Sequence, residues 1–105
     1  MAPGRRVAFV TLLLAAACGP ARAATIEITM ENLEISPAVA SAKVGDTIEW
    51  INKDVLLHSA TARNGDFDVK LSPKKPASFV LKKAGTVDYY CRYHPNMRAT
   101  LKVEP

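Results

Sequence analysis

The stretch "AGTVDYYCRYHPNMR", residues 84–98, decides how this sequence is interpreted. It opens with a turn signal at Ala84-Gly85 and continues as a strand-like run to Cys91. Cys91, His94 and Met97 then stand at every third position. This spacing has three possible interpretations: one face of a helix, a chance arrangement, or part of a metal site.

A helix stripe is disfavoured by the residues themselves. Pro95 lies inside the stretch, and a proline moves the residue before it, His94, away from helical geometry. The flanks on both sides are strand-like, so a loop between two strands is predicted. Chance stays open at this point, because cysteine, histidine and methionine each occur in protein cores.

The rest of the chain alternates short strand-like runs with turns. No segment after residue 23 has helical periodicity, and there is no internal repeat. Seven or eight short strands in roughly 80 residues predict an all-β fold, a small antiparallel sandwich or barrel. The strand candidates are 25–30, 33–35, 39–44, 47–50, 78–81, 86–91 and 99–103.

The first 23 residues have the pattern of a secretory signal. Arg5 and Arg6 precede an uncharged apolar run, which ends near a small-x-small cleavage site at 21–23. We therefore expect residues 1–23 to be removed, leaving one domain at 24–105 in the periplasm. A lipid anchor at Cys18 is a less favoured alternative, because the residue three positions before it is small rather than a larger aliphatic one.

Removal of the signal changes both the charge and the cysteine count. The full chain has 14 basic and 10 acidic residues, and loss of Arg5, Arg6 and Arg22 leaves 11 against 10. This balance gives no case for nucleic-acid binding. Cys91 becomes a lone thiol in an oxidising compartment, a liability unless it is buried, catalytic or metal-bound.

The other histidine, His58, favours the metal site. With it the chain offers two imidazoles, a thiolate and a thioether, the ligand set of blue-copper electron-transfer sites. A thioether is a poor ligand for zinc, whose structural sites are closed by Cys or His. The sequence therefore predicts one type 1 copper ion, with His58, Cys91, His94 and Met97 as its ligands.

On these residues the sequence resembles the cupredoxins, the type 1 blue-copper proteins, over most of 24–105. "VGDTIEWINKD" (44–54) is similar to the family's strand before the first histidine, and "AGTVDYYCRYHPNM" (84–97) to its last strand and ligand loop. Among the amicyanin-like and plastocyanin-like members, the Cys-x-x-His-x-x-Met spacing is most similar to amicyanin, because plastocyanin and pseudoazurin have longer His-to-Met intervals. The resemblance implies a Greek-key β-sandwich of seven to eight strands with copper near one end, and Trp50 and Phe79 in the core.

The resemblance also implies a function. The protein would be a monomeric periplasmic electron carrier rather than an enzyme, with copper cycling between Cu(II) and Cu(I). Partners would be redox proteins met transiently, such as a c-type cytochrome or a periplasmic dehydrogenase. His94 would be the ligand at the solvent edge, in an apolar patch with Pro95, Leu56 and Leu57. Arg92 and Arg98 flank the ligands and would steer an acidic partner.

Two residues beside the ligands depart from the family pattern. Ser59 stands where the family often has an Asn that braces the two ligand loops, and Asn96 replaces an aromatic residue, so both would tune the site differently.

Two other functions would use the same candidate ligands. One is copper storage or delivery, against which the lack of Met-rich or His-rich tracts counts. The other is a cysteine enzyme using Cys91 and a histidine, which would leave Met97 without a role.

Overall fold

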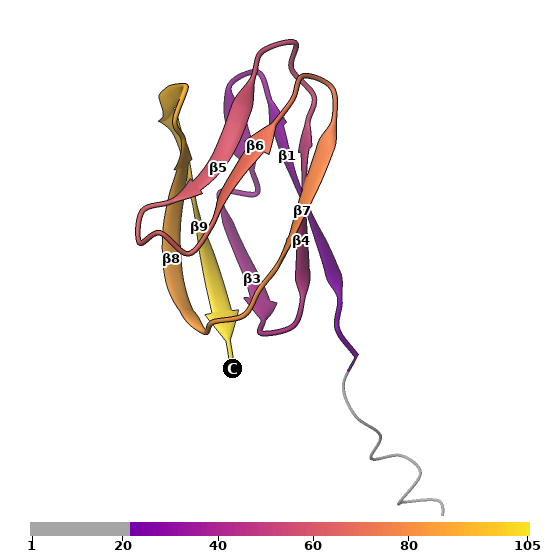
Figure 1. The fold of residues 1–105 in the computed structure, drawn as a ribbon, viewed down its shortest axis with the longest axis vertical. Coiled ribbons are helices and arrows are strands. Elements are labelled where there is room, and N and C mark those ends of the chain that lie inside the picture. Colours follow the sequence, from indigo (N-terminus) through magenta and orange to yellow (C-terminus); the bar gives the residue numbers. More distant parts are fainter. Residues whose placement is uncertain (1–21) are drawn as a thin grey trace, which may run out of the picture.

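The computed structural model describes residues 22–105, which form two β-sheets packed face to face (Figure 1). The four-stranded sheet has the order β2-β1-β4-β7, and the five-stranded sheet has the order β3-β9-β8-β5-β6. The strands are β1 (Thr25–Glu31), β2 (Glu34–Ser36), β3 (Val39–Lys43), β4 (Thr47–Asn52), β5 (His58–Ala62), β6 (Asp68–Leu71), β7 (Pro76–Val80), β8 (Gly85–Cys91) and β9 (His94–Glu104). The predicted signal, residues 1–23, lies almost wholly outside the described residues.

The all-β sandwich predicted from the sequence is confirmed, with nine strands in the described part of the chain. The added strands are β5 and β6. All five residues of β5 are buried, so the strand lacks the alternation that marks a half-exposed one. The sheets are also mixed rather than purely antiparallel, because β1 pairs with β4 and β3 with β9 in parallel.

The core forms where the inward faces of the two sheets meet. Strand β4 alternates strictly, with Ile48 and Trp50 pointing inward. The Trp50 ring lies 5.4 Å from that of Phe67, and its indole N–H donates a 3.2 Å hydrogen bond to the hydroxyl of Tyr89. Burial raises the pKa of Tyr89 to about 12, so its hydroxyl stays protonated at neutral pH. The half-buried ring of Phe79 packs 5.4 Å from Phe67, so Trp50 and Phe79 both belong to the packed interior.

The predicted loop between the strands that flank Cys91 and Met97 is present, but its predicted length is wrong. Strand β9 begins at His94, directly opposite Cys91, so the turn contains only residues 92–93. The register then slips from Cys91↔His94 to Tyr90↔Arg98, which leaves residues 95–97 without a partner on β8. Such a β-bulge re-aims side chains and tolerates a proline, since Pro95 has no N–H to offer a ladder.

The β8–β9 turn and the β4–β5 connection lie at the end of the sandwich away from the C-terminus (Figure 1). His58 is the first residue of β5, Cys91 the last of β8 and His94 the first of β9. Strand ends from distant parts of the sequence therefore meet at one end of the five-stranded sheet.

Candidate metal centre

Three predicted ligands meet around Cys91. The Cys91 Sγ atom lies 3.7 Å from His58 Nδ1 and 3.7 Å from His94 Nδ1. The three ligand atoms all lie within 4.8 Å of one another. Cys91 and His58 have no solvent exposure, whereas His94 is half-buried. The structure thus places one thiol and two imidazoles around a common point.

These separations fit a single bound ion. With metal–sulfur and metal–nitrogen bonds of about 2.3 and 2.1 Å, as in zinc sites, sulfur and nitrogen would be about 3.6 Å apart at a tetrahedral angle and about 3.8 Å at a trigonal one. The observed 3.7 Å lies between these values. Both sulfur–nitrogen separations therefore suit binding to one ion.

Met97 lies on the β-bulge beside this cluster and is only 2% exposed. Together with His94 it lines a surface hollow of about 420 Å³, whose other residues are Leu33, Tyr93, Pro95 and Asn96. A buried thioether that lines the same hollow as one of the imidazoles adds a donor that suits copper and that zinc does not prefer.

Asp54, which no sequence motif indicates, orients His58. Its Oδ2 lies 2.8 Å from His58 Nε2, and its carboxylate accepts backbone N–H bonds from Asn32 (2.7 Å) and Leu33 (3.1 Å). Burial alone would raise the pKa of Asp54, but the hydrogen bonds from His58 and the two amides outweigh it and hold that pKa below its usual range. A carboxylate on Nε2 favours the tautomer whose Nδ1 lone pair faces the metal position.

The β4–β5 connection is held by a buried amide. Asn52 has no solvent exposure, and its Nδ2 donates to the carbonyl oxygens of Leu56 (2.8 Å) and Leu71 (3.1 Å). Its Oδ1 accepts the backbone N–H of Asp54 at 2.9 Å. The loop that carries Asp54 toward His58 is therefore fixed from within the core.

Ser59 links the two ligand-bearing strands. It is 1% exposed, and its Oγ accepts the backbone N–H of Arg92 at 2.9 Å. The guanidinium of Arg92 forms an ion pair with Asp68, whereas Arg98 lies exposed on β9 opposite Tyr90. Ser59, although smaller than the Asn that the family often has at this position, thus joins the elements that carry His58 and Cys91.

The apolar surface around His94 has a different composition from the predicted patch. Leu33 (47% exposed) and Tyr93 (45% exposed) line the hollow with Pro95, and Asn96 adds a polar group. Leu56 is exposed on the β4–β5 connection, but neither it nor Leu57 lines this hollow. Leu33 was missed because it comes from the β1–β2 turn, some sixty residues away in sequence.

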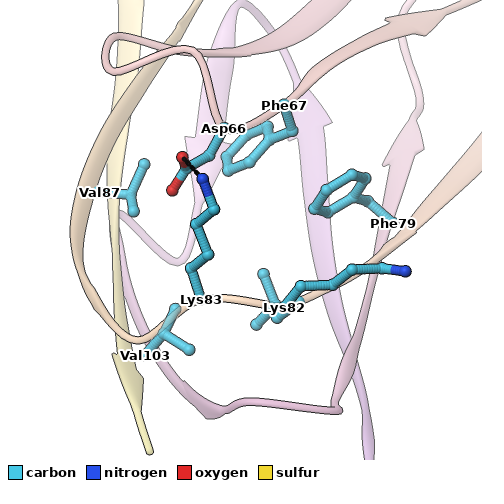
Figure 2. A pocket seen from close by; sticks show the side chains of 8 residues that line it. Asp66, Phe67, Phe79, Lys82, Lys83, Val87 and Val103 are labelled. Carbon is cyan, nitrogen blue, oxygen red and sulfur yellow. Dashed lines mark ion pairs between the residues drawn. The ribbon is translucent and has the colours of Figure 1, made fainter.

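A separate apolar pocket of about 130 Å³ lies beside the β7–β8 connection (Figure 2). Phe67, Phe79 and Val87 line it, and an ion pair of 3.6 Å joins Lys83 to Asp66 at its side. It shares no residue with the cluster around Cys91. The candidate metal centre is thus independent of this pocket.

The family model of a cupredoxin-like domain matches residues 5–103. The chain belongs to the cupredoxin family. Amicyanin of Paracoccus denitrificans is 35% identical over 68 residues, which is 59% of this chain and 52% of that protein, so the match spans about half of the relative. The methylamine utilization protein MauL of Methylorubrum extorquens is 32% identical over 80% of this chain and 77% of its own length.

Solved amicyanins share this cupredoxin fold. The reduced Cu(I) form of an amicyanin variant superposes with a TM-score of 0.65 at 29% identity, covering 85% of this chain and 89% of the other. Cupredoxins bind copper, and in this cupredoxin His58, Cys91 and His94 form the potential metal site. Family membership and donor chemistry therefore point to the same metal.

Proposed function

We propose that this cupredoxin is an exported electron carrier with one type 1 copper ion. His58 and His94 would hold the ion through their imidazoles and Cys91 through its thiolate, and Met97 would add its thioether. The observation that carries this proposal is the 3.7 Å separation of Cys91 Sγ from both Nδ1 atoms, with the buried thioether of Met97 in the bulge that follows His94. When bound, the copper accepts and releases one electron.

The protein's own residues favour this role over chemistry on a substrate. Asp54 and Asn52 fix His58 in a buried position, so the donor atoms need little movement between two oxidation states. His94 is half-buried at the hollow lined by Leu33, Tyr93 and Pro95. An electron would leave through this imidazole when a partner covers the hollow.

The partners we propose are redox proteins that dock transiently on this hollow, such as a c-type cytochrome or a periplasmic dehydrogenase. Similarity to amicyanin and to a methylamine utilization protein supports a place in the oxidation of small amines. We also propose that residues 1–23 direct export to the periplasm. Within residues 22–105 the structure has no helix long and apolar enough to cross a membrane.

The test is a redox cycle on the purified protein beginning at Ala24. After loading with Cu(II), the protein should accept one electron per chain from a reduced c-type cytochrome and return it to an oxidant. It should keep its copper through repeated cycles. Transfer of Cu(I) to a competing metal-binding protein during the cycle, with no electron exchange, would instead support copper delivery and contradict a carrier.

A further inference from the structure

A closed ring of hydrogen bonds lies beside the candidate metal centre, on the outer face of β5. The backbone N–H of Arg92 donates to Ser59 Oγ at 2.9 Å, and Ser59 Oγ lies 2.8 Å from Thr61 Oγ1. Thr61 donates to Asp68 Oδ1 at 2.9 Å. The other oxygen of Asp68 pairs with the guanidinium of Arg92, so the chain of contacts begins and ends on one residue.

The ionised carboxylate sets the direction of every bond in this ring. Asp68 can only accept, so the single hydroxyl proton of Thr61 must point to it. Thr61 must then accept from Ser59, and Ser59 in turn is left to accept from the Arg92 amide. Ser59 and Thr61 are 1% and 8% exposed, so a break in the ring would leave buried polar groups without partners.

The ring lies where the backbone pairing between β5 and β8 ends. The paired residues of β5 and β8 are Ala62↔Tyr89 and Thr61↔Tyr90, so this ladder ends before it reaches His58 and Cys91. Ser59 follows His58 in sequence and Arg92 follows Cys91. Beyond the last ladder pair, the bond from the Arg92 amide to the Ser59 side chain joins the two ligand-bearing strands.

We propose that Thr61 and Asp68 are positioning residues for the metal centre. They hold Ser59 in its accepting orientation and tie down both ends of Arg92, which fixes the distance between His58 and Cys91. A surface ion pair thereby acts on a buried site. The inference rests on the proposed copper site, but the ring itself exists in the metal-free protein.

The experiment replaces the hydroxyl at position 61. Thr61→Val keeps the shape of the side chain and removes the link, whereas Thr61→Ser keeps the hydroxyl. Thr100→Val is the matched control, because Thr100 makes a 2.8 Å bond to Asp88 in the same sheet, away from the ligands. Asp68→Ala is a second test with little risk to folding, since the Asp68 side chain is 55% exposed.

Three quantities are measured for each variant: Cu(II) affinity against a chelator, the visible and EPR spectra, and amide hydrogen exchange at Arg92 without metal. Thr61→Val and Asp68→Ala should bind copper about tenfold more weakly, with altered spectra and faster Arg92 exchange. Thr61→Ser and Thr100→Val should match the wild type in all three. Wild-type copper affinity and spectra in Thr61→Val and Asp68→Ala would overturn the proposal.

The metal-free readout separates this inference from the proposed function. If the wild-type protein takes up no copper, the electron-carrier proposal fails, while Arg92 exchange still reports on the ring. Unchanged Arg92 exchange in Thr61→Val would overturn the ring as a restraint, whatever the copper chemistry.

Discussion

The two histidines at the metal centre stand in opposite surroundings. His58 is fully buried and its far nitrogen is held by Asp54, which is itself held by backbone amides of the β1–β2 turn. His94 is half-buried, begins β9 and borders an open hollow. In residues 22–105 its ring makes no hydrogen bond other than the contact with Cys91. One side of the site is thus built for rigidity and the other for access.

The largest effect is expected from removing each imidazole in turn. His58→Gly and His94→Gly should both lose the wild-type copper site. Added imidazole should restore it only in His94→Gly, because that position opens to solvent while the space left by His58 is closed. The restored fraction is measured from the visible spectrum during an imidazole titration. Equal rescue of both variants would remove the proposed difference between them.

Loss of the carboxylate behind His58 should weaken copper binding next. Asp54→Ala should reduce Cu(II) affinity by about tenfold or more, because the ring loses the partner that fixes its tautomer. Asp66→Ala is the control, since Asp66 lies beside the apolar pocket and pairs with Lys83. Chelator competition measures the Cu(II) affinity of the wild type, Asp54→Ala and Asp66→Ala. An Asp54→Ala protein that binds as tightly as the control would show that His58 needs no such support.

A change at the bulge should affect the spectrum more than the stability. Met97→Leu nearly conserves side-chain volume, so the free energy of unfolding should fall by less than about 1.5 kcal/mol. The visible and EPR spectra should shift nevertheless, because the thioether is lost. Denaturant unfolding of the metal-free protein and spectra of the copper form give both numbers. Identical spectra would exclude Met97 as an axial donor.

The smallest effect is expected at Asp46, which tests a region away from the site. Backbone N–H bonds from Ala24 (2.8 Å) and Lys43 (2.9 Å) hold the pKa of Asp46 below its ordinary value. A folded-state pKa below the unfolded one stabilises the fold above the unfolded value, and this contribution is lost as pH falls through the folded value. The free energy of unfolding of Asp46→Asn should therefore fall less than that of the wild type as the pH drops below about 4.

The sequence indicated a candidate ligand set more readily than the groups around it. Cys91, His94 and Met97 were predicted as ligands because their atom types alone define a preference for copper. Asp54 could not be predicted in this way, because its role depends on the β1–β2 turn, where Asn32 and Leu33 take positive φ values of 56° and 62° to present their amides. A leucine in that conformation is uncommon, and composition gives no sign of it.

Local patterns also misjudged two parts of the fold. Pro95 indicated a loop, but in the structure it lies in a bulge of β9, where no partner strand requires its N–H. Strand β5 was missed because all five of its residues are buried, so it lacks the alternation of a half-exposed strand. Ser59 and Thr61 on its outer face are hydrogen-bonded to each other. Both depend on contacts between residues distant in sequence.

The most direct test of the proposed copper site is a Cu(II) titration of the metal-free protein followed by visible and EPR spectroscopy, with Cys91→Ser beside it. We expect one copper per chain and an intense blue thiolate-to-copper absorption in the wild type, absent from Cys91→Ser. A wild-type protein that stays colourless with bound Cu(II), or a blue colour that survives in Cys91→Ser, would contradict it.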